Sequence, residues 1–319
     1  MRSLVSVAIP SFNESANLPI LVERLQRVFT ELSTQFDFEV VICDNGSTDN
    51  SFEFLRQLHH QDPRFKTVRL VRNFNMEGGM MAALSCVRGD ACIIMSADLQ
   101  DPPELIPTFL EHWRAGYENV YTVITRRGGE SLFRRTAAQL YYRVSSALSS
   151  FPIPRNSSDF RLVSRAAYTA FNALPERVRF LRTTWAWLGF ASIGVEYERP
   201  PRTSGTSTFS ALVTAPYAFR AILGSSFKLL RMIPLIGVLT SMIAVMLLGG
   251  LSVAWIVGGV PFSGFGSIVG LVLLTFGILM LFIGVLSEYV SMILDEVRQR
   301  PNYIVESDLG ISPRNDHKY

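Results

Sequence analysis

Residues 91–104 read Ala91-Cys92-Ile93-Ile94-Met95-Ser96-Ala97-Asp98-Leu99-Gln100-Asp101-Pro102-Pro103-Glu104, an apolar run that ends at carboxylates and two prolines. The apolar run predicts a buried strand, and the prolines predict the start of the next element. Asp98, Gln100 and Asp101 would then stand at the carboxyl end of that strand. Their side-chain oxygens are the ligands that Mg²⁺ and Mn²⁺ prefer. The alternative is an ordinary acidic turn that caps a helix.

Apolar segments alternate with amphipathic segments from Val5 to Ala115 and beyond. This alternation predicts βαβ units and a doubly wound, mostly parallel α/β sheet that is buried on both faces. The expected strands are Val5–Ile9, Phe38–Cys43, Thr67–Val71, Ala91–Met95 and Val120–Ile124, and the expected helices are Leu18–Leu32, Ser51–His60, Gly79–Val87 and Glu104–Ala115.

Polar side chains follow each of the first four expected strands. They are Asn13 and Glu14, then the run Asp44-Asn45-Gly46-Ser47-Thr48-Asp49, then Arg72 and Asn73, then Asp98 and Gln100. Ligands of open α/β sheets bind outside the carboxyl ends of the strands. The four polar sets therefore predict one shared site.

The turn after the first strand argues against two familiar nucleotide-binding motifs. Residues 10–14 lack the glycines of a dinucleotide fold, although Asp44 stands where such a fold holds a ribose. The chain also has no phosphate-cradling loop of the nucleoside-triphosphatase type and no nucleophile elbow. The remaining possibility is a nucleotide that is held by carboxylates and whose diphosphate is neutralised through a metal. This is the chemistry of nucleotide sugars.

The C-terminal third predicts membrane segments. No charged residue occurs from Met232 to Ser287, which is enough for two crossings of roughly 20 residues each. We expect helices near Leu230–Val257 and Ser267–Tyr289; a buried hairpin of a soluble core is the alternative. Basic residues flank both spans, so the positive-inside tendency places the N-terminal domain and both termini in the cytoplasm, as expected for an integral protein of the plasma (inner) membrane. These basic residues are Arg220, Lys228, Arg231, Arg298 and Arg300.

The net charge bears on the class of partner, and the cysteine spacing bears on the redox state of the thiols. A net charge of +3 is too small to indicate nucleic-acid binding, but it suits the surface of an anionic bilayer. The cysteines Cys43, Cys86 and Cys92 lack metal-ligand spacing, so we expect them to be reduced.

The motifs resemble those of the polyisoprenyl-phosphate glycosyltransferases of glycosyltransferase family 2, which include dolichol-phosphate mannose synthases and bactoprenol glucosyltransferases. The resemblance extends to about Val305. It implies a GT-A fold and inverting transfer of a hexose from a nucleotide diphosphate sugar, here a UDP-sugar, to polyprenyl phosphate, with Mg²⁺ or Mn²⁺ as cofactor. It rests on Ile9-Pro10-x-x-Asn13-Glu14, Asp44 to Asp49, Arg72-Asn73-Phe74, Ala97 to Glu104, Ser158-Asp159-Phe160-Arg161-Leu162, the two C-terminal spans and Arg300-Pro301-x-Tyr303.

The same resemblance implies roles for individual residues. Asp98 and Gln100 would carry the metal on the donor diphosphate, beside Ser96. Asp159 would orient the donor or align the acceptor; its alternative is a cap before a helix over Ser164–Leu174. The nucleoside would be held by Pro10, Asn13, Glu14 and Asp44, the acceptor phosphate by Arg126 and Arg134, and the donor phosphates by Arg202, Gly205 and Ser207. The arginines could equally form a basic surface that faces solvent or lipid.

The expected organisation has four parts. Residues 1–207 form the GT-A-like catalytic domain, and residues 208–229 form an amphipathic helix in the membrane interface. A helix packed on the catalytic domain is the alternative for the latter segment. Residues 230–290 hold two transmembrane helices and a short loop, and residues 291–319 form a cytoplasmic tail. Small residues in the spans would permit a homo-oligomer, namely Gly249, Gly250, Gly277 and Gly284.

Three positions depart from the family pattern. Ser96 replaces a further aspartate, Asn75 replaces a glycine, and Thr208 replaces a lysine or arginine. These departures keep open a catalytically silent relative that serves as a nucleotide-sugar or lipid-binding scaffold in the membrane. A processive polysaccharide synthase is a third hypothesis, but it needs more spans and a Gln-x-x-Arg-Trp segment, which the sequence around Arg182 does not supply.

Overall fold

The computed structural model describes residues 2–127, 154, 156–176, 179, 181–200, 228–258 and 264–311. The chain divides into two compact units. The first contains the described residues up to Pro200 together with those from Arg300 onward, and the second contains the two long helices that lie between them in the sequence.

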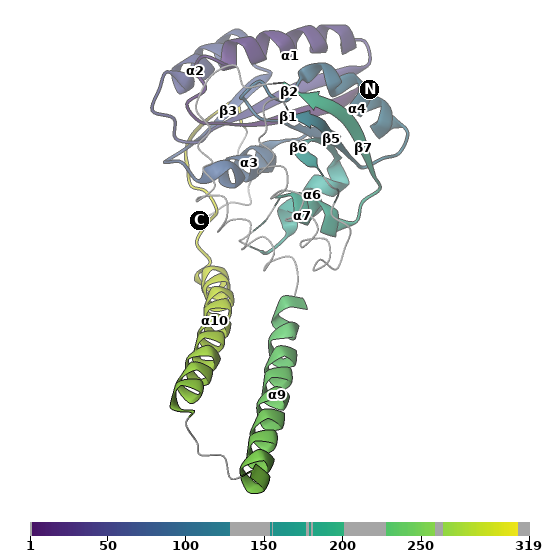
Figure 1. The fold of residues 1–319 in the computed structure, drawn as a ribbon. Coiled ribbons are helices and arrows are strands. Elements are labelled where there is room, and N and C mark those ends of the chain that lie inside the picture. The colour runs from purple at the N-terminus through teal and green to yellow at the C-terminus, as the bar shows by residue number, and fades with distance from the viewer. Residues whose placement is uncertain are drawn as a thin grey trace. The chain divides into compact units, whose positions relative to one another are not determined.

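A mixed eight-stranded sheet forms the centre of the first unit, in the order β7-β5-β6-β4-β1-β2-β3-β8 (Figure 1). Strands β1, β2, β3 and β4 are mutually parallel where they pair, and β5 is parallel to β7. Strands β6 and β8 run against their neighbours. The strands are β1 (Ser3–Ser11), β2 (Phe36–Asp44), β3 (Phe65–Leu70), β4 (Ala91–Ile94), β5 (Asn119–Arg127), β6 (Ser157–Ser164), β7 (Ser192–Arg199) and β8 (Val305–Leu309).

Helices cover both faces of this sheet. Residues of α1, α2 and α4 pack on one face, and residues of α3, α6 and α7 pack on the other. The expected α/β architecture is therefore confirmed as a mixed sheet between two helical layers. The helices are α1 (Leu18–Leu32), α2 (Ser51–Gln61), α3 (Asn75–Cys86), α4 (Ile106–Arg114, preceded by a 3-10 turn over Pro103–Leu105), α6 (Arg165–Ala173) and α7 (Leu181–Leu188).

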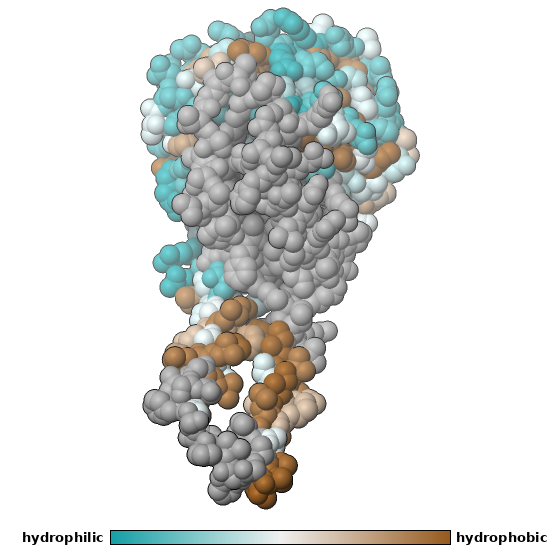
Figure 2. Space-filling model, in the orientation of Figure 1, coloured by the Kyte–Doolittle hydropathy of each residue, from teal (hydrophilic) through white to brown (hydrophobic). Residues whose placement is uncertain are grey.

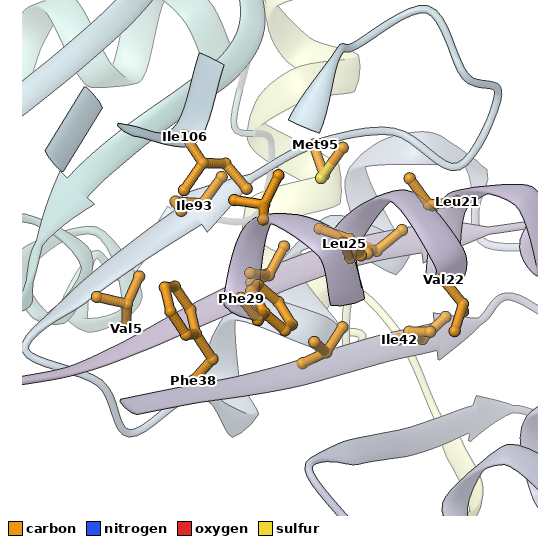
Figure 3. Packing of buried hydrophobic residues seen from close by; sticks show 14 of the residues in the cluster. Val5, Leu21, Val22, Leu25, Phe29, Phe38, Ile42, Ile93, Met95 and Ile106 are labelled. Carbon is orange, nitrogen blue, oxygen red and sulfur yellow. The ribbon is translucent and has the colours of Figure 1, made fainter. Parts of the chain in front are cut away.

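The apolar strands explain the two helical layers. Alternate residues of a strand point to opposite faces, and in β1 the side chains of Val7 and Ala8 belong to different core clusters. On the first face, Leu25 and Phe29 of α1 lie over the sheet (Figure 3). The rings of Phe29 and Phe38 stack with centroids 4.3 Å apart. Burying a side chain of this size contributes about 1.5–3 kcal/mol.

Strand β6 was not expected from the sequence. It carries Ser157, Ser158 and Arg161, all of them buried, so it shows neither an apolar run nor a clean alternation. Its place between β4 and β5 supplies the neighbours that bury these polar groups. The helix expected over Ser164–Leu174 is confirmed as α6, and its N-cap is Ser164, whose Oγ accepts a hydrogen bond from the Ala167 amide (3.2 Å).

The chain after the long helices returns to the sheet. The sequence predicts a tail over residues 291–319, and the structure shows that Val305–Leu309 within it form β8 at the sheet edge, antiparallel to β3. The Val71 amide donates to the Ile304 carbonyl (3.1 Å), and Tyr303 Oη donates to Ser85 Oγ (2.9 Å). The described residues up to Ile311 are therefore part of the first unit.

The second unit consists of α9 (Lys228–Gly258) and α10 (Phe265–Arg298). Both helices expose large apolar side chains, which appear brown in Figure 2. Within the searched, described residues, the segment Leu271–Arg298 is long and apolar enough to cross a membrane, and α9 contributes a shorter apolar stretch, Ile236–Leu247. The expected pair of transmembrane helices thus has one segment of sufficient length and hydropathy, and the second span stays a prediction.

Candidate active site

The loops after β1 and β2 are joined by hydrogen bonds. The Asn13 amide donates to Ser47 Oγ (3.0 Å), and Asn13 Oδ1 accepts from the Thr48 amide (2.8 Å). Asn13 adopts a φ of 55°, which asparagine tolerates better than most residues. One residue on, the Glu14 amide donates to Ser51 Oγ (3.0 Å). The two expected nucleoside loops therefore form one surface, next to Pro10 at the end of β1.

Asp44 ends β2 beneath this surface. Its side chain is fully buried, and Oδ1 accepts a hydrogen bond from the Ser47 amide (3.1 Å). Its other oxygen, Oδ2, has no hydrogen-bond partner among the described residues. Arg69 supplies a cation beside it, with Nε 3.5 Å from Oδ2. A buried carboxylate oxygen without a hydrogen bond is rare, so Asp44 is suited to accept one from a ligand.

The loop after β3 packs against the same surface. Gly46 has a φ of +72°, and a Cβ at this position would lie 2.5 Å from the Arg72 carbonyl carbon. Asn45 Oδ1 accepts from the Phe74 amide (2.9 Å), and Asn45 Nδ2 donates to the Asn75 carbonyl (2.7 Å). This close approach requires glycine at position 46.

Asn75 stands where the family pattern has glycine, and its backbone explains why the substitution is tolerated. Its φ is +61°, in the left-handed region. Asparagine enters this region more readily than other residues with a Cβ. The departure therefore preserves the backbone conformation that glycine would adopt.

The loop after β4 holds the predicted metal corner. Asp98 Oδ1 accepts from the Gln100 amide (3.2 Å) and lies 2.9 Å from Ser96 Oγ, whose single proton can go to either Asp98 or Asp101. Gln100 Nε2 donates to the Pro200 carbonyl (3.3 Å). Between them, Leu99 has a φ of +61° although its side chain is buried in the core. Such a conformation costs of order 1–3 kcal/mol, and the core contact of Leu99 holds the loop in it.

Asp101 lies buried behind Asp98. Its Oδ2 accepts from both the amide (2.9 Å) and the hydroxyl (2.6 Å) of Ser96, while its Oδ1 makes no hydrogen bond in the part of the chain that the structure describes. Arg199 places a guanidinium nitrogen 4.0 Å from Oδ1. Burial raises the pKa of Asp101 above its ordinary value, and the charge of Arg199 opposes this.

This corner fits a hard divalent cation. Its donors are carboxylate and amide oxygens, which Mg²⁺ and Mn²⁺ prefer. In the residues that the structure describes, no group of three histidine, cysteine or acidic side chains is arranged to hold a metal by itself. One or two protein oxygens completed by substrate phosphates is the usual pattern for Mg²⁺. Asp98 and Gln100 match that pattern.

Asp159 lies on β6 and pairs with an arginine that we did not predict. Arg182 of α7 donates from Nε to Oδ1 (3.1 Å) and from a terminal nitrogen to Oδ2 (2.9 Å). Burial raises the pKa of Asp159, but the charge and hydrogen bonds of Arg182 outweigh this effect. The pKa therefore lies below its ordinary value. Since Ser164 caps α6, the alternative role of Asp159 as that cap is excluded.

Buried Arg161 adds a second cation beside Asp159. A terminal nitrogen of Arg161 donates to the Ser158 carbonyl (3.0 Å). Burial lowers the pKa of this guanidinium to about 10, so it stays charged near neutral pH. Arg161 was noted only as part of a motif, and Arg182 only because it did not complete the synthase segment. Their common feature is that both lie near the Asp159 carboxylate, and this proximity becomes visible only once β6 and α7 are arranged in the fold.

The remaining predicted residues are not described at the side-chain level. Arg134, Arg202, Ser207 and Thr208 lie outside the described residues, as does most of the expected interfacial helix over 208–229. The backbone of Arg126 belongs to β5, and its side chain lies outside the description.

The mixed α/β sheet, with helices on both faces and polar residues after its strands, has the GT-A-like fold of a solved glycosyltransferase structure. The chain belongs to glycosyl transferase family 2, whose family model matches residues 6–171. It is 33% identical over 306 residues to the uncharacterized glycosyltransferase YkcC of Bacillus subtilis, with 96% of this chain and 94% of that protein covered.

Two further comparisons bear on the resemblance found in the motifs. The chain is 32% identical over 303 residues to the bactoprenol glucosyl transferase of Shigella phage SfX, with 95% and 99% of the two chains covered. This confirms the resemblance to bactoprenol glucosyltransferases. The crystal structure of glucosyl-3-phosphoglycerate synthase from Mycobacterium tuberculosis with Mn²⁺, UDP-glucose and phosphoglyceric acid matches with a TM-score of 0.50 at 17% identity, over 70% of this chain and 79% of that one. That likeness establishes the shared fold.

Proposed function

We propose that this glycosyltransferase moves one hexose from a UDP-sugar to polyprenyl phosphate at the cytoplasmic face of the membrane, with inversion at the anomeric carbon. The observation that carries the proposal is the similarity to a bactoprenol glucosyl transferase over 95% of this chain. Coverage of that extent includes α9 and α10 as well as the sheet. A lipid acceptor would explain why a glycosyltransferase domain and two long apolar helices occur in one chain.

The donor would bind across the carboxyl ends of β1, β2 and β4. Asp44 Oδ2, which makes no hydrogen bond among the described residues, would accept one from the nucleoside, and the joined loops of Asn13 and Glu14 would cover it. Asp98 and Gln100 would hold Mg²⁺ or Mn²⁺ against the diphosphate. When bound there, the cation would neutralise charge on the leaving diphosphate.

The acceptor explains why a strong general base is not needed. A phosphate monoester is already anionic near neutral pH, so its oxygen can attack the anomeric carbon directly. The new bond forms between that oxygen and the anomeric carbon as the bond to the diphosphate breaks, and UDP leaves. Attack opposite the leaving group inverts the configuration.

Asp159 is suited to orientation in this scheme. Its lowered pKa keeps it ionised near neutral pH and makes it a weak base. A carboxylate held by two hydrogen bonds from Arg182 can accept a hydrogen bond from a sugar hydroxyl in a fixed direction. This matches an acceptor that brings its own charge.

The membrane part of the proposal rests on the length and exposure of α10. Its span of 28 residues, Leu271–Arg298, corresponds to about 42 Å of helix, longer than the roughly 30 Å hydrocarbon core. We propose that α9 also spans the membrane, so that α10 returns the chain to the cytoplasmic side. The interfacial helix over 208–229 and a homo-oligomer built on glycines of the spans stay predictions.

An acceptor panel tests this function. The purified full chain is incubated with Mg²⁺ or Mn²⁺, labelled UDP-hexoses and one of three acceptors: polyprenyl phosphate, polyprenol without phosphate, or 3-phosphoglycerate. We expect labelled product only with polyprenyl phosphate. Product from 3-phosphoglycerate alone would overturn the lipid acceptor, and no product from any combination would favour the silent relative.

A further inference from the structure

Strand β8 brings a carboxylate to the edge of the donor site. The pairing of β8 with β3 places Arg69 opposite Ser307 and Leu70 opposite Val305, with an irregularity between the two pairs. Glu306 is therefore the extra residue of β8 at this point. A β-bulge re-aims the side chain of its extra residue, and here the Glu306 carboxylate lies 3.0 Å from Arg69 Nε.

Arg69 links this carboxylate to the candidate nucleoside residue. The same Nε that faces Glu306 lies 3.5 Å from Asp44 Oδ2. The guanidinium carbon sits 4.2 Å from the centre of the Phe52 ring, which fixes its plane. Glu306, Arg69 and Asp44 thus form a chain that runs from the segment after α10 to the end of β2.

The three side chains of this Glu306–Arg69–Asp44 network differ in their exposure to solvent. Asp44 is fully buried, whereas the side chains of Arg69 and Glu306 are 29% and 51% exposed. With one cation between two carboxylates, Arg69 is shared. Neither contact of Arg69 Nε has the geometry of a hydrogen bond. Asp44 Oδ2 likewise makes no hydrogen bond among the described residues. If Glu306 lost its charge, Arg69 could turn fully to Asp44 and occupy the oxygen that the nucleoside needs.

We infer that Glu306 is a positioning residue of the donor site, which shares Arg69 with Asp44 and thereby leaves Asp44 Oδ2 available to the nucleoside. This rests on the proposed function only in taking Asp44 as a nucleoside contact. It gives β8 a role in donor binding, although β8 follows α9 and α10 in sequence and Glu306 belongs to none of the quoted motifs.

Binding of UDP to the purified full chain, measured by isothermal titration calorimetry, tests this role. For Glu306→Gln we expect about tenfold weaker UDP binding, equivalent to roughly one hydrogen bond. Asp308→Asn is the matched control, because Asp308 is an exposed residue of the same strand; it should bind UDP like the wild type. In the transfer assay we expect the KM for the UDP-hexose to rise by a similar factor in Glu306→Gln.

The double variant Glu306→Gln with Arg69→Gln separates positioning from mere support of β8. Removing Arg69 removes the competitor, so UDP affinity should recover toward the wild-type value. A double variant as weak as Glu306→Gln, or weaker, would show a structural role and overturn the inference. Equal UDP affinity in the wild type and Glu306→Gln would also overturn it and leave the proposed function standing. A wild type that binds no UDP would overturn both.

Discussion

Ser96 shows how one departure from a family pattern can preserve a site. Its hydroxyl lies 2.9 Å from Asp98 Oδ1 and 2.6 Å from Asp101 Oδ2, so it can donate to either carboxylate. An aspartate in its place would put a third negative charge against the other two. The serine therefore supplies a neutral hydrogen-bond donor where an aspartate would add charge, and the predicted ligands Asp98 and Gln100 remain in place.

The substitution Ser96→Asp is expected to couple folding to the metal. Without a cation, repulsion among three close carboxylates should lower the melting temperature below that of the wild type. Mn²⁺ together with UDP should raise the melting temperature of the variant by more than that of the wild type, because binding relieves the repulsion. Thermal unfolding of both proteins, with and without Mn²⁺ and UDP, measures this. Ser96→Thr, which keeps the hydroxyl, is the control, and equal metal-induced shifts in all three proteins would contradict the account.

Arg182→Met is expected to destabilise the fold by removing the two hydrogen bonds that Arg182 donates to Asp159. The pair is partly exposed, so the loss should be about 1–2 kcal/mol, between the ranges for exposed and buried pairs. The folded-state pKa of Asp159 is lowered, so the stabilisation is present above the unfolded pKa and is lost as the pH falls through the folded one. The difference between variant and wild type should therefore be full at pH 7 and shrink below about pH 4. Urea unfolding at both pH values measures it, and a constant difference would contradict this origin.

Among the helices and strands, apolar periodicity predicted those elements whose formation depends on burying apolar side chains. The first five strands and α1 to α4 occur within a few residues of their expected ranges, because each strand buries apolar side chains and each helix presents one apolar face. The same principle fails for β6, whose buried Ser158 and Arg161 depend on neighbours from distant segments. It fails for β8 because the pairing with β3 bridges more than 200 residues, and nothing local indicates it.

The candidate site was predictable to the same extent. Residues that follow strands in the sequence, such as Asn13, Asp44 and Asp98, could be assigned to one edge of the sheet from the topology rule alone. Arg69 and Arg182 could not, since their relevance comes from side-chain contacts across elements. Their neighbours along the chain carry no signal of those contacts.

At the scale of the whole molecule, the topology makes a specific prediction about the connection between α9 and α10. With the catalytic domain in the cytoplasm and two spans, a cysteine introduced at Ser263 should react with a membrane-impermeant maleimide only from the non-cytoplasmic side. The experiment uses a Cys86→Ala background. Cys43 and Cys92 are buried, and burial raises the pKa of both thiols, so they should stay unlabelled in the folded protein. Labelling from the cytoplasmic side would contradict the two-span arrangement.

We propose that the enzyme adds one hexose to a lipid phosphate, with Asp98 as a ligand of the donor-site metal. Mass spectrometry of the lipid formed from polyprenyl phosphate and a UDP-hexose by the purified full chain tests this most directly, with Asp98→Asn as the paired variant. We expect a lipid heavier by a single hexose in the wild type, and at least about a hundredfold less of it in the variant, as for removal of a group that stabilises charge in the transition state. A ladder of several hexoses, or an equal yield from Asp98→Asn, would contradict it.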